Sequence, residues 1–242
     1  MNCNKIDQRE INCMECAVRK ESLFKDLNDV EIVQAESYVD SQKEYKAGEF
    51  IINEHERTQS SYILASGYVV LGTYLEDGSK QIFQIALPGD AIGFGVNEEN
   101  GYFAQVVTDV KACVISNKSL EKMFKNHSTV ALRLIENLSN NNSSYQQYLL
   151  NLGRKSARQA LAYLIMDVTN RIKRQVPNCN LENLQACFFP LNQEDMADVL
   201  GLTKVHVSRV ISQFKKEGLI ECGHKKLKVL NKEKLSEIGV YS

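Results

Sequence analysis

The chain has 242 residues, of which 43% are hydrophobic and 24% charged, and its formal net charge is −1. This length and apolar content allow one or two domains with substantial cores. The first residues, Met1 to Asp7, lack the apolar region of a signal peptide, and no run of 18 apolar residues occurs. These features exclude a membrane-spanning helix, so we expect a cytoplasmic protein with no membrane partner.

Three of the seven cysteines, Cys3, Cys13 and Cys16, lie in an N-terminal segment at residues 1–30. An odd number of cysteines in a chain this long fits a reducing compartment better than a disulfide framework. Cys13 and Cys16 form a Cys-x-x-Cys pair, which can direct two thiolates at one metal or cluster, although four ligands are normally required. On these residues alone, free thiols are the favoured interpretation and a metal site is the alternative.

Short β-rich runs separated by turn signals occupy about residues 44 to 115. The runs are Glu49 to Ile52, Tyr62 to Leu64, Tyr68 to Tyr74, Gln81 to Ala86 and Val106 to Ile115. Asp77-Gly78 lies between apolar alternations and is a strong hairpin signal. Several short strands at such regular spacing indicate a small sandwich or barrel. We therefore expect a β-barrel domain at residues 31–127.

Two helices are predicted next, a short one from Ser116 to His127 and a longer one from Ser128 to Leu152. In the longer helix, six residues recur in steps of three and four: Ile135, Leu138, Asn142, Tyr145, Leu149 and Leu152. This is the a/d seam of a coiled coil, so residues 128–153 are expected to form a dimerisation helix. A polar Asn142 in the seam fixes register at a cost in stability and predicts a weak dimer. The alternative is that the run from Ser139 to Ser144 is a loop between shorter helices.

The stretch from Leu191 to Ile220 has the pattern of two short helices joined by a tight turn. Asn192 can cap the first helix, with Asp195 at its third position. That helix should end at Gly201, which tolerates a positive φ. Thr203 can cap a second helix from about Lys204 to Glu217. This is the arrangement of a DNA-reading helix-turn-helix.

The second of these helices has two different faces. Its core face is predicted to carry Val207, Val210, Ile211 and Phe214. The residues left to reach bases near its start are Thr203, Lys204, Val205, His206, Ser208 and Arg209. Among them Arg209 is the first candidate, because its two-pronged donor fits guanine O6 and N7.

A basic hairpin follows this helix. Two β-like runs, Leu219 to Cys222 and Leu227 to Leu230, are separated by Gly223 to Lys226 and resemble a wing. From Thr203 to Lys234 nine Lys or Arg stand against three Glu, a local charge of +6 where phosphates would lie. The alternative is an ordinary helical hairpin with a solvated lysine face.

Before these elements we expect a helix from Lys155 to Gln175 and a short strand from Ala186 to Phe189, within a DNA-binding domain at residues 154–242.

The order of these parts resembles the CRP/FNR superfamily of bacterial transcription regulators. The resemblance is carried by the turn Leu87-Pro88-Gly89-Asp90-Ala91-Ile92-Gly93-Phe94, the long seam helix, Leu200-Gly201-Leu202-Thr203 and Val207-Ser208-Arg209, and it covers roughly residues 13 to 240. It implies an α+β fold, with a cyclic-nucleotide-binding-like jelly roll as sensor, a long dimerisation helix and a C-terminal winged helix-turn-helix. It also implies a homodimer on a palindromic double-stranded operator, with RNA polymerase as a protein partner.

The family's cyclic-nucleotide branch clamps the cyclic phosphate with an Arg-Ser or Arg-Thr pair. This chain has no arginine between Arg57 and Arg133, and the corresponding stretch reads Tyr102-Phe103-Ala104-Gln105. A buried phosphate would then lack its charge partner. We therefore do not expect cyclic AMP as a ligand.

The oxygen-sensing FNR branch is the closer resemblance. Cys13 and Cys16 match its N-terminal pair, and Cys113 matches its cysteine late in the barrel. The family usually places one more cysteine shortly after the pair, but this chain has none there. Cys3 could supply the fourth thiolate of a [4Fe–4S] cluster, whereas without it Cys113 is only a small core residue. Three further cysteines are expected to be structural: Cys179, Cys187 and Cys222.

The recognition helix also departs from the FNR pattern, which has a glutamate where this chain has Val205. An apolar side chain suits a thymine methyl better than a cytosine amino group.

We predict a sequence-specific dimeric regulator whose DNA binding is coupled to oxygen or redox state through an iron–sulfur cluster. The alternative is a family member without a cluster that senses haem-bound gas or a small ligand, or is constitutive. An enzyme is not expected, because no catalytic triad, phosphate loop or carboxylate pair stands out.

Overall fold

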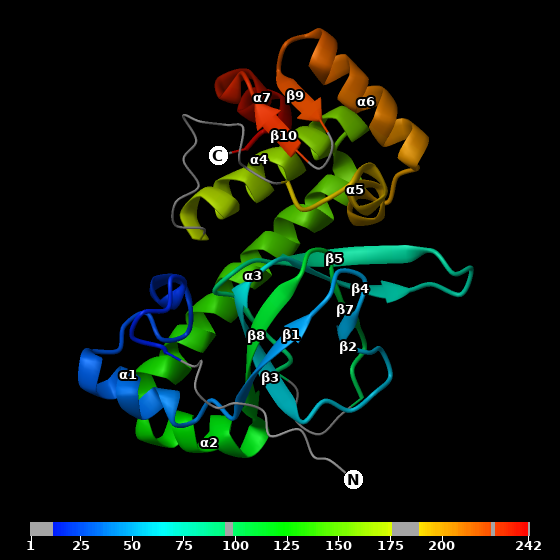
Figure 1. The fold of residues 1–242 in the computed structure, drawn as a ribbon. Helices are drawn as coiled ribbons and strands as arrows, with labels where there is room; N and C mark the ends of the chain where they lie inside the picture. Colours follow the sequence, from blue (N-terminus) through cyan, green and yellow to red (C-terminus); the bar gives the residue numbers. More distant parts are fainter. Residues whose placement is uncertain (1–11, 95–98, 176–188, 224–225, 242) are drawn as a thin grey trace.

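A computed structural model of the chain describes residues 12–94, 99–175, 189–223 and 226–241. A β-rich N-terminal half, one long helix and a C-terminal half of helices with a small hairpin follow one another (Figure 1). None of the described helices is both long and apolar enough to cross a membrane. The predicted short strand at 186–189 falls largely on residues outside the described part.

Two four-stranded antiparallel sheets form the N-terminal half, in the orders β1-β8-β3-β6 and β2-β7-β4-β5 (Figure 1). Their strands are β1 (Ser41–Tyr45), β2 (Phe50–Ile52), β3 (Ser60–Ser66), β4 (Val69–Tyr74), β5 (Lys80–Ala86), β6 (Ala91–Ile92), β7 (Phe103–Val106) and β8 (Val110–Ser116). Alternate residues of both sheets, such as Leu64 of β3 and Leu71 of β4, share one buried cluster. The expected barrel is therefore a jelly roll of two packed sheets and not a closed barrel.

The strand prediction was wrong at one place and incomplete at others. The single run expected from Val106 to Ile115 is two strands, because β7 ends at Val106 and β8 begins at Val110. Between them Thr108 accepts a hydrogen bond from the backbone of Tyr68, which holds the turn. The hairpin expected at Asp77-Gly78 joins β4 to β5, and Gly78 has a φ of +80° there. The polar strand β1 and the short β6 were not predicted.

Helices cover the outer face of the β1-β8-β3-β6 sheet. They are the 3-10 turn η2 (Arg19–Glu21), α1 (Asp29–Glu36), α2 (Asn117–Asn126) and the start of α3 (Ser128–Arg154). Ile63 of β3, Ile115 of β8 and Met123 of α2 share one buried cluster with the N-terminal segment. Helix α1, which was not predicted, begins with a reciprocal capping box between Asn28 and Glu31.

Helix α3 is continuous, so the alternative of a loop at Ser139 to Ser144 is wrong. These residues have poor helix propensity. The exposed Ser143 Oγ donates to the backbone carbonyl of Ser139, one turn earlier, at 3.2 Å. Burial of Val130 and Asn151 on one face shows that packing against the rest of the chain supports the helix near both ends.

The C-terminal half packs on the outer face of the other sheet. It contains α4 (Ala157–Gln175), α5 (Gln193–Leu200), α6 (Lys204–Lys216), β9 (Ile220–Gly223), β10 (Lys226–Val229) and the unpredicted α7 (Lys232–Gly239). Its core includes Leu161, Leu164 and Phe214, and it continues into Ile82 and Ile85 of β5. The two halves therefore share one apolar interior.

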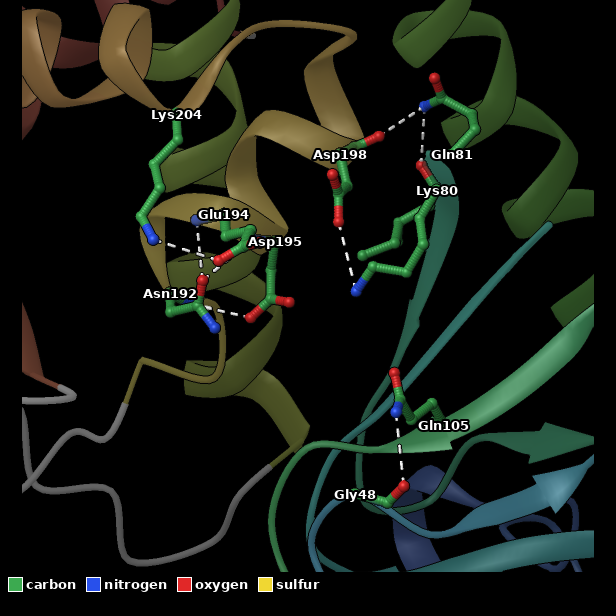
Figure 2. A network of polar contacts seen from close by, with 10 residues as sticks. Gly48, Lys80, Gln81, Gln105, Asn192, Glu194, Asp195, Asp198 and Lys204 are labelled. Carbon is green, nitrogen blue, oxygen red and sulfur yellow. Dashed lines mark hydrogen bonds and ion pairs between the residues drawn. The ribbon is translucent and has the colours of Figure 1, made fainter. Parts of the chain in front are cut away.

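Polar contacts reinforce this junction (Figure 2). Gln81 Nε2 of β5 donates to the carbonyls of Asp198 and Val199 at 2.8 and 3.2 Å, at the C-terminal end of α5. Lys80 Nζ lies 3.3 Å from Asp198 Oδ2. Sequence patterns gave no signal for these contacts, because their partners are more than a hundred residues apart.

Candidate DNA-binding surface and cysteine site

The first helix of the predicted pair begins where its cap was expected. Asn192 Oδ1 accepts from the backbone N–H of Glu194 and Asp195 at 2.7 and 3.0 Å, and Asp195 Oδ2 accepts from the Asn192 N–H at 3.0 Å (Figure 2). This is a complete capping box. Burial raises the pKa of the Asp195 carboxyl above its ordinary value, although the Asn192 N–H opposes the shift.

The turn between the two helices has the geometry that the sequence predicts. Gly201 adopts the left-handed backbone conformation, with a φ of +59°. The Leu202 N–H donates to the Ala197 carbonyl at 3.0 Å. Thr203 Oγ1 accepts from the backbone N–H of His206 at 3.2 Å and caps α6. The cap fixes the direction in which α6 leaves the turn.

Helix α6 has the two faces that its periodicity predicts. Val207, Val210, Ile211 and Phe214 are buried. The guanidinium of Arg158, from α4, lies over the Phe214 ring at 4.9 Å from its centroid. The same guanidinium makes two hydrogen bonds to the Glu217 carboxylate, at 2.9 and 2.6 Å. These contacts join the end of α6 to α4 on the side opposite its exposed face.

The six predicted DNA-reading residues all lie on or beside the outward face of α6. Thr203, Lys204, Val205, His206 and Arg209 are exposed, and Ser208 is half-buried. Lys204 Nζ approaches Glu194 Oε2 at 3.1 Å, but both side chains are largely exposed and such pairs are weak. Among the described residues, no carboxylate pairs with Arg209. Its guanidinium therefore remains available for another acceptor.

The predicted wing is an antiparallel hairpin of β9 and β10 directly after α6. The Leu230 N–H donates to the Leu219 carbonyl at 2.8 Å and closes its base. His224 and Lys225 at the tip lie outside the described residues. Lys228 of β10 is paired in register with Glu221 of β9.

Three of the four predicted cluster ligands lie in one region. Cys13 is buried, and Cys113 of β8 packs against the same apolar cluster. The pKa of the Cys13 thiol is raised to about 12. Burial is the main cause, and the nearby Cys113, Glu36 and Cys16 add to it. Gln42 Nε2 donates to Cys113 Sγ at 3.8 Å. All three thiols are free.

The donors fit an iron–sulfur cluster in their chemistry, since soft thiolates are its usual ligands. Among the described residues, however, no three His, Cys, Asp or Glu side chains are grouped closely enough to hold a metal ion. Cys3, the predicted fourth ligand, lies outside the described part, as do Cys179 and Cys187. Cys222 of β9 is free and half-buried, far along the chain from the other thiols.

Helix α3 carries an exposed apolar stripe along the predicted seam. Its exposed members are Leu132, Ile135, Leu138, Leu149, Leu150 and Leu152. Asn142 is also exposed and interrupts the stripe. Leu132 and Leu150 were not among the predicted seam residues, although they lie three residues before Ile135 and one after Leu149.

Tyr145 differs from the other predicted seam residues. Its hydroxyl donates to Gln84 Oε1 at 2.6 Å, and its ring meets Phe83 edge-on with centroids 6.4 Å apart. Both partners belong to β5 of the same chain. Tyr145 therefore lies at the border between the seam and the jelly roll.

Comparison with known proteins agrees with this architecture. Residues 147–238 match the Crp-like helix-turn-helix domain, and residues 42–127 match the cyclic nucleotide-binding domain. The chain is 28% identical to the transcriptional activator protein FnrL of Cereibacter sphaeroides, over 86% of this chain and 83% of the relative. It is 23% identical to the fumarate and nitrate reduction regulatory protein of Escherichia coli, over 95% of this chain and 90% of the relative.

A solved structure gives the same result for the fold. The structure of FixK2 from Bradyrhizobium japonicum superposes with a TM-score of 0.73 at 25% identity, over 84% of this chain and 98% of that chain. The match spans both halves, so the sheet pair, the long helix and the helix-turn-helix occur together in another protein in the same order.

Proposed function

Because the chain belongs to the CRP/FNR superfamily of DNA-binding transcription regulators, we propose that it is a homodimer whose operator binding depends on oxygen or redox state. The observation that carries the DNA-reading part is the outward face of α6, where Arg209 is exposed and free of carboxylate partners in the described part of the chain. The opposite face is buried, and its Phe214 ring packs against Arg158 of α4.

In this proposal α6 enters the major groove and its first two turns read base edges. Arg209 donates to guanine O6 and N7, and Val205, which is 61% exposed, contacts a thymine methyl. Thr203, Lys204, His206 and Ser208 contact bases or phosphates, and the basic wing binds the backbone. The phosphate contacts supply affinity, and the base contacts supply sequence preference.

Replacing Arg209 tests this assignment. Binding of Arg209→Ala to the selected operator should weaken by about 1–3 kcal/mol, and base preference should relax at one position of each half-site. Lys216→Ala, at the far end of the same helix, is the control and should weaken binding to all duplexes slightly and equally. Fluorescence anisotropy on the operator and its single-base variants distinguishes the two. A uniform loss for Arg209→Ala would make Arg209 a phosphate contact instead.

Dimerisation is proposed to occur along α3. Exposed Ile135, Leu138, Leu149 and Leu152 form an apolar stripe that water would otherwise cover. Pairing two such helices presents both α6 helices at once. The second half-site is then bound at a high effective concentration, which multiplies the affinity of one protomer.

Redox dependence is proposed to come from a [4Fe–4S] cluster held by Cys3, Cys13, Cys16 and Cys113. When bound, such a cluster supplies sensitivity to oxygen, which degrades it. Two observations support this site: the grouping of Cys13 and Cys113, and the packing of Val130 and Leu134 of α3 against the same apolar cluster. Cys13 and Cys113 therefore share one apolar cluster with the start of α3.

Iron and acid-labile sulfide, measured on protein purified without oxygen, test the cluster. About four irons per chain are expected for the wild type and for Cys222→Ser, with loss of iron in Cys3→Ser and bleaching in air. A colourless, iron-free wild type that still binds its operator would reject the cluster. It would favour a regulator that senses another ligand or is constitutive.

A further inference from the structure

One set of contacts outside the DNA-reading face ties the helix-turn-helix to the jelly roll. Strand β5 presents Lys80 and Gln81 to the C-terminal end of α5, where they meet Asp198 and Val199 (Figure 2). We call these four residues the clasp. Asp198 lies six positions before Lys204, the first residue of α6. Because α6 follows α5 after a short capped turn, the contacts that hold α5 also hold α6.

The clasp is directional. Gln81 Nε2 donates to the Asp198 and Val199 carbonyls at 2.8 and 3.2 Å, in the last turn of α5, where carbonyls lack partners within the helix. Lys80 Nζ lies 3.3 Å from Asp198 Oδ2, and these side chains are only 24% and 19% exposed, so water screens the pair less than a surface pair. Ile82 and Val199 share one buried cluster beside the clasp. Apolar burial is non-directional, so the polar contacts fix where α5 lies on β5.

The end of α3 reaches the turn between α5 and α6. A Cβ atom placed on Gly201 would lie 3.4 Å from Leu152 Cδ2, so the two residues are neighbours. Leu152 is 44% exposed and is the last residue of the apolar stripe along which two α3 helices are proposed to pair. In the proposed dimer, one side chain therefore separates the seam from the turn that leads into α6.

Helix α4 is attached to the jelly roll at a separate point. Arg171 Nη2 donates to the Ile85 carbonyl and to Asp90 Oδ2, each at 2.9 Å. One point of attachment would leave the C-terminal half free to pivot, whereas two points fix its orientation. Of the two, the clasp is the one that contacts the helix-turn-helix itself.

We propose that the clasp positions α6 for DNA recognition: it fixes α5 on β5 beside the end of α3, and so sets the half-site spacing that the dimer accepts. This inference rests on the proposed function. Lys80 and Gln81 belong to the jelly roll and act through α5, so they are positioning residues. One base pair added between half-sites moves one of them by about 3.4 Å and turns it by about 35°. An α6 held by the clasp cannot follow that shift, whereas a released α6 can.

Fluorescence anisotropy on the selected operator, and on versions with one base pair inserted or deleted between the half-sites, tests the clasp. The wild type should prefer the selected spacing. Gln81→Ala and Lys80→Glu should each reduce this preference by about tenfold, the factor expected for one or two hydrogen bonds. Binding to a duplex with a single half-site should stay as in the wild type, because α6 is unchanged. The control Gln105→Ala, which removes a hydrogen bond to Gly48 within the jelly roll, should keep the wild-type preference.

Exchanging the charges separates a positioning role from a loss of stability. Asp198→Lys alone should relax the spacing preference, and Asp198→Lys combined with Lys80→Glu should restore it, because the ion pair forms again with its charges reversed. The inference is overturned if Gln81→Ala and Lys80→Glu keep the wild-type preference, if the exchanged pair stays as relaxed as its single variants, or if Gln105→Ala relaxes the preference equally.

A measurement without DNA distinguishes failure of this inference from failure of the proposed function. A wild type that binds operator and scrambled duplex equally would contradict the proposed function. Energy transfer between dyes attached through unnatural amino acids at the exposed positions 43 of β1 and 216 of α6 then reports on the clasp alone. The distance distribution should broaden in Gln81→Ala and not in Gln105→Ala. An unchanged distribution in Gln81→Ala would overturn the inference.

Discussion

Replacing Asn142 by isoleucine should strengthen the proposed dimer. Asn142 is exposed in the protomer and interrupts the stripe between Leu138 and Leu149, which are 50% and 67% exposed. When two α3 helices pair, the amide must enter the seam, where it fixes register at a cost in stability. Burying an isoleucine instead contributes about 1.5–3 kcal/mol per side chain, and the dimer has two. The dissociation constant should therefore fall by about a hundredfold or more.

Sedimentation equilibrium measures this constant directly, in air and without oxygen. Gln147→Ile is the matched control, because residue 147 is exposed on the same helix but lies to one side of the stripe. The variant Asn142→Ile should dimerise more tightly in both atmospheres, and Gln147→Ile should not. An unchanged constant would place residue 142 off the interface. An equal gain in the control would mean that added hydrophobicity alone causes association.

Three predictions concern folding. Phe214→Ala removes a fully buried ring and the platform for Arg158, so the free energy of unfolding in urea should fall by about 3–5 kcal/mol. Gln81→Ala leaves two carbonyls at the end of α5 without their donor and should lower the free energy of unfolding by about 1–3 kcal/mol. The control Gln105→Ala removes one longer, exposed hydrogen bond to Gly48 (Figure 2) and should lower it by at most about 0.5 kcal/mol. Asp195→Asn should change the pH dependence of unfolding. Burial raises the pKa of Asp195 in the folded state above its ordinary 3.8, so the native state binds the proton more tightly than the unfolded chain does. The unfolding free energy of the wild type should therefore fall relative to that of the variant as the pH rises above about 3.8.

A specific result would contradict each of these three folding predictions. A loss below about 1 kcal/mol for Phe214→Ala would mean that α6 is not anchored through this ring. Equal effects of Gln81→Ala and Gln105→Ala would show that the junction of the two halves does not depend on Gln81. A stability difference between the wild type and Asp195→Asn that rises with pH would reverse the direction assigned to the Asp195 pKa.

The helix-turn-helix was predictable because its signals are local. The Asn192 cap, the positive φ of Gly201 and the spacing of Val207 and Phe214 each act within one or two helical turns. The structure reproduces all of them. The exposed apolar stripe of α3 was also visible as a heptad pattern. The helix is continuous through the Ser/Asn run because packing overrides weak propensity.

The remaining features depend on contacts between distant parts of the chain. Strand β1 reads Ser-Gln-Lys-Glu-Tyr, a polar sequence that is a strand only because it pairs with β8. Tyr145 fitted the heptad but contacts Gln84 of the jelly roll. The approach of Cys13 to Cys113 joins residues a hundred positions apart. No local pattern encodes such contacts.

The most direct test of the proposed function is the affinity of one anaerobic sample for a selected operator and for a scrambled duplex, before and after exposure to air. Fluorescence anisotropy at fixed salt gives the four dissociation constants, one for each duplex before and after exposure to air. The anaerobic protein should bind the operator at least about a thousandfold more tightly than the scrambled duplex, and air should abolish the difference. Equal affinity for the two duplexes in both states would contradict sequence-specific recognition by α6, and an operator affinity that air leaves unchanged would contradict its coupling to oxygen.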